Sequence, residues 1–168
     1  MAHNITMKGS PLTLVGTLPE IGQDCPDCML VGNDLSGIKL SDYAGNICVI
    51  TSVPSLDTGV CNTMTRKFNE EAGKLGDAAV VLTVSMDLPF AQKRWCGMAG
   101  IDNVITLSDH RKGEFGEKFG VLIKELRLLA RAVFVVDKQG KIRYKQLVSE
   151  QTNEPDYEEV LNAVKNLL

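Results

Sequence analysis

The stretch NICVITSVPSLDTGVC, residues 46–61, decides the fold, because it joins a strand, a loop and the start of a helix. Residues 46–53 are apolar and β-branched over the length of one central strand. Residues 54–60 have the composition of a loop, and residues 62–75 continue with the amphipathic spacing of a helix. The stretch therefore predicts a strand, a loop and a helix, with Cys61 where the loop enters the helix.

The alternation of strands and helices continues along the chain. In chain order, the expected elements are strand 78–86, helix 89–98, strand 104–107, helix 113–119, strand 130–136, strand 141–148 and helix 155–168. Strands that alternate with helices form βαβ units with parallel strands. The turn DKQG, residues 137–140, instead favours an antiparallel hairpin between the last two strands. We expect an α/β fold with a mixed central sheet flanked by helices.

Two short runs precede this pattern, at residues 5–8 and 12–15, and the sequence GSP between them indicates a turn. They predict an N-terminal β-hairpin at about residues 4–16. We see no linker or internal repeat, so residues 1–168 are expected to form a single domain. A domain of this length buries roughly 70 % of the surface of its unfolded chain and needs no disulfide framework.

The composition limits the partners and the compartment. The chain is 44 % hydrophobic and 23 % charged, and its 18 basic and 21 acidic residues give a net charge of −3. This weak negative charge argues against nucleic acid and anionic membranes as partners. No window approaches the ~20 apolar residues of a membrane-spanning helix, and the N-terminus lacks the pattern of a signal peptide. Five cysteines, an odd number, favour a reducing compartment, and we expect the cytoplasm.

The residues around Cys61 are suited to nucleophilic chemistry. Free amide groups in a first helical turn and the positive end of the helix dipole stabilise a thiolate, which is the nucleophilic form of cysteine. Pro54 can fix the loop and shield the sulfur from water. The hydroxyl of Thr58 can donate and accept hydrogen bonds at once, as binding of a peroxide oxygen requires.

Attack on an O–O bond also requires a positive group near the departing oxygen. Arg131 is our candidate, because a guanidinium stays charged at any working pH. Its neighbours in sequence, residues 128–130 and 132–134, are apolar. An arginine in such a setting is more often held for a purpose than solvated.

The spacing P-x-x-x-T-x-x-C, filled by Pro54, Thr58 and Cys61, resembles the peroxidatic motif of peroxiredoxins. Five strings along nearly the whole chain are similar to the thiol peroxidase branch, the atypical 2-Cys peroxiredoxins: PSLDTGVC, MDLPFAQKRWCG, NVITLSD, LLARAVFVVD and EPDYE. The resemblance implies a thioredoxin-like fold, a homodimer, reduction of hydrogen peroxide and organic hydroperoxides, and thioredoxin as the electron donor. It gives peroxide binding to Thr58 and Arg131 and the attack to Cys61. No metal or organic cofactor is required.

Oxidation of Cys61 would leave a sulfenic acid that a second thiol must capture. The resemblance places this resolving cysteine at Cys96 in the same chain. The alternatives are that Cys96 is a half-buried helix thiol beside Trp95, or that it meets Cys61 of another subunit. An intrachain disulfide between two helices predicts local unfolding around residues 58–66 and 90–100.

The remaining cysteines leave alternatives open. Cys48 lies within the central strand and is best explained by core packing. Cys25 and Cys28, in the sequence CPDC, are outside the family pattern and could be incidental surface thiols, an auxiliary disulfide or electron relay, or part of a metal site. Two other functions therefore stay open: a thiol–disulfide oxidoreductase that uses Cys25 and Cys28, and a non-catalytic peroxide sensor that uses Cys61.

Overall fold

The computed structural model describes residues 5–168, so residue 4, at the expected start of the hairpin, lies outside the described residues. The strands are β1 (Ile5–Met7), β2 (Ser10–Leu12), β3 (Leu14–Val15), β4 (Met29–Val31), β5 (Gly37–Lys39), β6 (Ile47–Ser52), β7 (Ala79–Ser85), β8 (Val104–Ser108), β9 (Leu122–Ile123), β10 (Ala132–Val136) and β11 (Ile142–Leu147). The helices are α1 (Gly59–Leu75), α2 (Pro89–Ala99), α3 (Glu114–Lys118) and α4 (Tyr157–Lys165), with 3-10 turns η1 (Leu40–Tyr43) and η2 (Gly76–Ala78).

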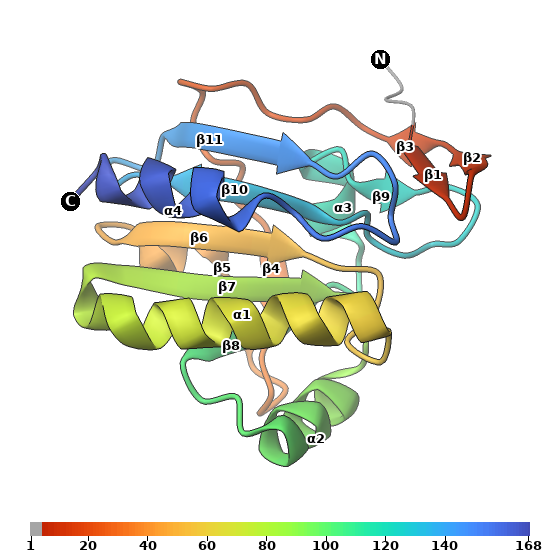
Figure 1. The fold of residues 1–168 in the computed structure, drawn as a ribbon, viewed down its shortest axis with the longest axis horizontal. Helices are drawn as coiled ribbons and strands as arrows, with labels where there is room; N and C mark the ends of the chain where they lie inside the picture. Colours follow the sequence, from red (N-terminus) through yellow and green to blue (C-terminus); the bar gives the residue numbers. More distant parts are fainter. Residues whose placement is uncertain (1–4) are drawn as a thin grey trace.

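Seven strands form the central sheet, in the order β11-β10-β6-β7-β8-β4-β5. The strands β6, β7 and β8 are parallel, whereas β10 and β11 on one side and β4 and β5 on the other run antiparallel to their neighbours. The expected mixed sheet is therefore confirmed. The helices α1 and α4 lie side by side on one face, as Figure 1 shows, and α3 lies on the other.

The continuous apolar run of β6 is explained by burial on both faces. Ile47 and Val49 pack in the core under α1 and α4, and Cys48 and Ile50 pack in the core on the opposite face. Because side chains alternate along a strand, each face receives every second residue. The central strand thus anchors both cores and ends at the loop that leads to Cys61.

Two details differ from the sequence expectation. The hairpin forms between β1 and β2, but β3 does not belong to it, because β3 pairs in a separate small sheet with β9, a two-residue strand that was not predicted. The strands β4 and β5 were not predicted. Each has three residues in a stretch rich in glycine and aspartate, which hides a pattern of period 2.

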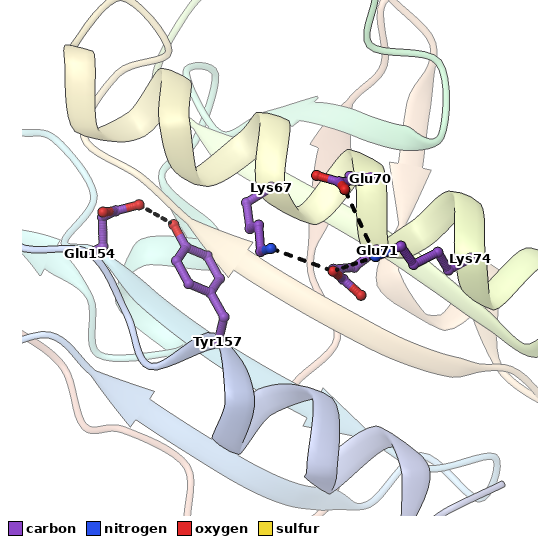
Figure 2. Close-up of polar contacts among 6 residues, drawn as sticks. All are labelled: Lys67, Glu70, Glu71, Lys74, Glu154 and Tyr157. Carbon is purple, nitrogen blue, oxygen red and sulfur yellow. Dashed lines mark hydrogen bonds and ion pairs between the residues drawn. The ribbon is translucent and has the colours of Figure 1, made fainter.

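The outer face of α1 carries ion pairs at helical spacing, which Figure 2 shows. Lys67 lies 3.6 Å from Glu71, and Lys74 lies 3.8 Å from Glu70 and 3.3 Å from Glu71. Pairs of this kind at a surface contribute at most about 1 kcal/mol each. They mark the solvent side of α1, so its apolar side faces the sheet. Among residues 5–168, no helix has both the length and the apolar character that crossing a membrane would require.

Candidate active site

Thr58 caps the N-terminus of α1 and thereby places Cys61 in the first helical turn. Its side-chain oxygen accepts a hydrogen bond from the backbone N–H of Cys61 at 3.2 Å, and its hydroxyl donates to the carbonyl oxygen of Ser55 at 3.3 Å. A threonine cap of this kind stabilises a helix by about 1 kcal/mol. Thr58 is exposed, whereas Cys61 is buried. The Thr58 hydroxyl thus belongs to an exposed residue that is bonded directly to the backbone of the buried Cys61.

Strand register brings Arg131 to the same place. Since β10 runs antiparallel to β6 with Ala132 opposite Ser52, Arg131 lies where β6 ends and the loop to α1 begins. Alternation along the strand puts Arg131 on the same face as Val133, which packs in the core under α1. The guanidinium Nη1 lies 3.3 Å from Cys61 Sγ, and both residues are almost fully enclosed, with 2 % and 0 % exposed.

The guanidinium is held by a residue that the sequence did not reveal. Nε and Nη2 of Arg131 both donate to the backbone carbonyl oxygen of Gln151, at 3.2 Å and 3.0 Å. The Gln151 side chain is buried, accepts from the Arg131 backbone N–H and donates to the carbonyl of Val148 at 2.6 Å. Gln151 lies in an irregular segment, and its role depends on tertiary contact, so no spacing in the sequence could indicate it.

The electrostatic character of the site follows from this burial. None of the ion pairs found among residues 5–168 includes Arg131, and its Nη1 faces two sulfur atoms, Cys61 Sγ and Met64 Sδ at 3.5 Å. A buried cation is costly unless negative charge lies beside it. Negative charge on the sulfur, or on an oxygen bound next to it, would satisfy that cation. Pro54 is buried in the loop before Thr58.

Cys96 lies on α2 and is half-buried. With Trp95 it packs against the same core cluster that contains Cys61. Its sulfur is 3.6 Å from the hydroxyl oxygen of Thr106 on β8, and burial raises the pKa of its thiol. All five cysteines are free, so the structure represents the reduced chain.

The cysteines of the CPDC sequence are not surface thiols, as one interpretation had them. Cys28 is buried and Cys25 is half-buried. Burial raises the pKa of Cys25 to about 12 and also raises that of Cys28. Cys25 and Cys48 line one apolar cavity of about 140 Å³ on the face of the sheet opposite to Cys61. Among residues 5–168, no three His, Cys, Asp or Glu side chains are grouped so that they could hold a metal ion.

Comparison with known proteins agrees with this fold. The Redoxin family model matches residues 20–161, and the chain belongs to the Redoxin family. Thiol peroxidases of Oceanobacillus iheyensis and Bacillus subtilis are 57 % and 56 % identical to it, over 95 % and 98 % of this chain and 96 % and 98 % of their own length. Within the family, the chain therefore stands among the thiol peroxidases, as the motif strings indicated.

Solved structures confirm the expected thioredoxin-like fold. A peroxiredoxin-like protein from Aquifex aeolicus superimposes with a TM-score of 0.93 at 46 % identity, over 100 % of this chain and 99 % of the other. A thiol peroxidase from Chromobacterium violaceum shares the fold with a TM-score of 0.87, although only 17 % of its residues are identical over 97 % of this chain and 95 % of its own. The fold thus persists at low sequence identity.

Proposed function

We propose that the chain reduces hydrogen peroxide and organic hydroperoxides, with Cys61 as the peroxidatic cysteine. The observation that carries this proposal is the 3.3 Å contact between Arg131 Nη1 and Cys61 Sγ at the start of α1. The Cys61 thiolate attacks one oxygen of the hydroperoxide, an S–O bond forms, and the O–O bond breaks. The departing alkoxide takes up a proton and leaves as the alcohol, and Cys61 becomes a sulfenic acid. Arg131 and Thr58 stabilise the charge on the two oxygens.

Cys96 is the proposed resolving residue. Its sulfur attacks the Cys61 sulfenic acid, an S–S bond forms, and the S–O bond breaks with release of water. Two thiols thus supply the two electrons that reduce the hydroperoxide. A thioredoxin dithiol then reduces the intrachain disulfide and becomes oxidised in turn. The relatives named as thiol peroxidases support the peroxidase step, and the position of Cys96 beside the Cys61 core cluster supports the intrachain disulfide.

The proposal includes a homodimer in the cytoplasm. Leu88, Phe90 and Met98, on and beside α2, are 53 %, 66 % and 82 % exposed, which supports a partner surface near Cys96. Sedimentation of the reduced protein tests the dimer. A cytoplasmic location agrees with the odd number of cysteines, five, in a chain long enough to fold without a disulfide framework.

One experiment separates this function from the alternatives. Steady peroxide consumption with a thioredoxin system is measured for the parent, Cys61→Ser, Cys96→Ser and a Cys25→Ser/Cys28→Ser double variant. We expect Cys61→Ser to be inactive, Cys96→Ser to stall after about one turnover, and the double variant to keep most of its activity. Full activity of Cys61→Ser would contradict the proposal. Stoichiometric peroxide loss without turnover in the parent would indicate a sensor.

A thiol–disulfide oxidoreductase centred on the CPDC cysteines is not favoured. The nucleophile in that reaction is a thiolate, and burial raises the pKa of both thiols, that of Cys25 to about 12. Such thiols are almost fully protonated at neutral pH. Loss of disulfide reduction in the double serine variant, with peroxide consumption retained, would reopen this alternative as a second activity.

A further inference from the structure

The loop that carries the peroxidatic site is tied to the neighbouring loop by one carboxylate. Asp87 lies between β7 and α2, the helix that carries Cys96. Its Oδ1 accepts from the Ser55 hydroxyl at 2.7 Å, and its Oδ2 accepts from the Leu56 backbone N–H at 2.9 Å. Both donors belong to the loop between β6 and α1. Because β6 and β7 are adjacent parallel strands, the two loops leave the same edge of the sheet.

The Asp87 side of this contact is fixed by the sheet. The Ser85 hydroxyl at the end of β7 donates to Asp87 Oδ2 at 2.7 Å, and the Ser108 hydroxyl at the end of β8 donates to the Asp87 carbonyl oxygen. Ser85 and Ser108 are fully buried. The Ser85 hydroxyl oxygen also accepts from Gln92 Nε2 of α2 at 3.0 Å. The position of Asp87 is thus fixed by hydrogen bonds from the ends of β7 and β8.

The other side leads directly to Cys61. The carbonyl oxygen of Ser55 accepts from the backbone N–H and from the hydroxyl of Thr58, each at 3.3 Å, and Thr58 in turn caps the N–H of Cys61. A chain of hydrogen bonds therefore runs from Asp87 through Ser55 and Thr58 to the first turn of α1. Hydrogen bonds to an ionised carboxylate are about twice as strong as neutral ones. The strongest contacts in this chain are those of Asp87.

We propose that Asp87 is a positioning residue, a latch that holds the Cys61 loop in its folded, peroxide-reactive form and limits the rate at which Cys96 captures the sulfenic acid. The inference rests on the proposed function. In this proposal, the first turn of α1 leaves its cap when the disulfide between α1 and α2 forms, and this movement breaks the bonds of Asp87 to Ser55 and Leu56. Slow release keeps the sulfenic acid exposed to a second peroxide, which produces the sulfinic acid.

The test uses the only tryptophan, Trp95, which is adjacent to Cys96, as a fluorescent reporter. Reduced protein is mixed with peroxide in a stopped-flow instrument, and the peroxide-dependent phase is separated from the later disulfide phase. In Asp87→Asn only one side-chain oxygen remains as an acceptor, because an amide nitrogen donates and does not accept, so the Ser55 hydroxyl and the Leu56 N–H can no longer donate to separate oxygens. We expect an unchanged first phase and a disulfide phase about tenfold faster, a factor that corresponds to about 1.4 kcal/mol. More peroxide should then be needed to inactivate half of the enzyme.

Two variants complete the design. Ser55→Ala removes one donor and should accelerate the disulfide phase by a smaller factor. Asp102→Asn, a change at an exposed carboxylate just beyond α2, should behave like the parent. An unchanged or slower disulfide phase in Asp87→Asn would overturn the latch, as would a slower peroxide phase with no gain in the second.

A direct readout separates the latch from the peroxidase function. The Leu56 amide donates to Asp87, and the Val53 amide donates to Val84 of β7. In reduced protein, hydrogen exchange at Leu56 should be about tenfold faster in Asp87→Ala, which removes both acceptor oxygens, with exchange at Val53 unchanged. A parent that shows no peroxide-dependent phase contradicts the proposed function. Unchanged exchange at Leu56 contradicts the latch whether or not the parent reacts.

Discussion

Arg131 stands out at the scale of single residues, because it is a buried arginine whose charged end faces sulfur rather than a carboxylate. Its apolar neighbours in sequence are what make it a candidate from the sequence alone. The sequence could not indicate that the Gln151 carbonyl holds the guanidinium, because Gln151 reaches Arg131 only when the segment after β11 folds back over β10. That Arg131 lies beside Cys61 could therefore be expected from their residue types, whereas the Gln151 anchor of the guanidinium could not.

Replacement of Arg131 by methionine should lower the second-order rate with hydrogen peroxide by about 10²- to 10³-fold, the usual loss when one charge-stabilising donor is removed. Arg131→Lys keeps the charge but loses the fork that grips the Gln151 carbonyl, so its rate should be intermediate. Stopped-flow kinetics measure both rates. Arg111→Met, at an exposed position, serves as the control. A methionine variant as fast as the parent would remove Arg131 from the mechanism.

At the scale of elements, the N-terminal hairpin is joined to the segment that holds Arg131. The Glu150 carboxylate accepts hydrogen bonds from the Thr6 hydroxyl at 3.0 Å and from the Gly9 N–H at 2.9 Å. The N–H of Gln151 also donates to the Thr6 carbonyl at 2.7 Å. The hairpin thus supports Gln151 from outside, a connection that the sequence pattern of the hairpin gave no reason to expect.

Hydrogen bonds from Thr152 and Gly9 lower the pKa of Glu150 from 4.5 to about 2. A lowered pKa means that the ionised carboxylate favours the folded form, so this contribution is present above pH 4.5 and is lost as the pH falls through about 2. Acid titration should therefore release the hairpin, which amide exchange at Gly9 and Thr152 would record. Glu150→Gln should show fast exchange at these amides at all pH values. If the protection of the Gly9 and Thr152 amides in the parent did not fall between pH 4.5 and about 2, the role given to Glu150 would be contradicted.

At the scale of the whole molecule, the site depends on the sheet more than on any one loop. The pairing of β6 with β10 fixes the positions of Cys61 and Arg131 relative to each other. The strand β6 was recognisable in the sequence because its continuous apolar run is explained by burial on both faces of the sheet. The short strands β4 and β5 at the far edge carry no site residue and were missed. What the sequence revealed was thus the part with the strongest hydrophobic signal, which is also the part that positions the chemistry.

Oxidation should change the start of α1 and the helix α2 but leave the central strands β6, β7 and β10 intact. In the proposed disulfide form, amide exchange is expected to accelerate at residues 58–66 and 90–100, where α1 and α2 would rearrange if the two Cα atoms start more than about 7 Å apart. The amides of β6, β7 and β10 should keep the slow exchange of buried strands. Exchange mass spectrometry on the reduced and oxidised forms measures the difference. Equal protection at the two helix ends would rule out the rearrangement.

The contact between Cys61 and Arg131 spans 70 positions of the chain, and the Gln151 anchor comes 20 positions later still. During synthesis, the complete P-x-x-x-T-x-x-C motif therefore leaves the ribosome well before its cation exists. Until then, Cys61 has no guanidinium beside it. On the proposed function, the nascent chain therefore lacks the group that stabilises the departing oxygen, and only the folded topology supplies that group.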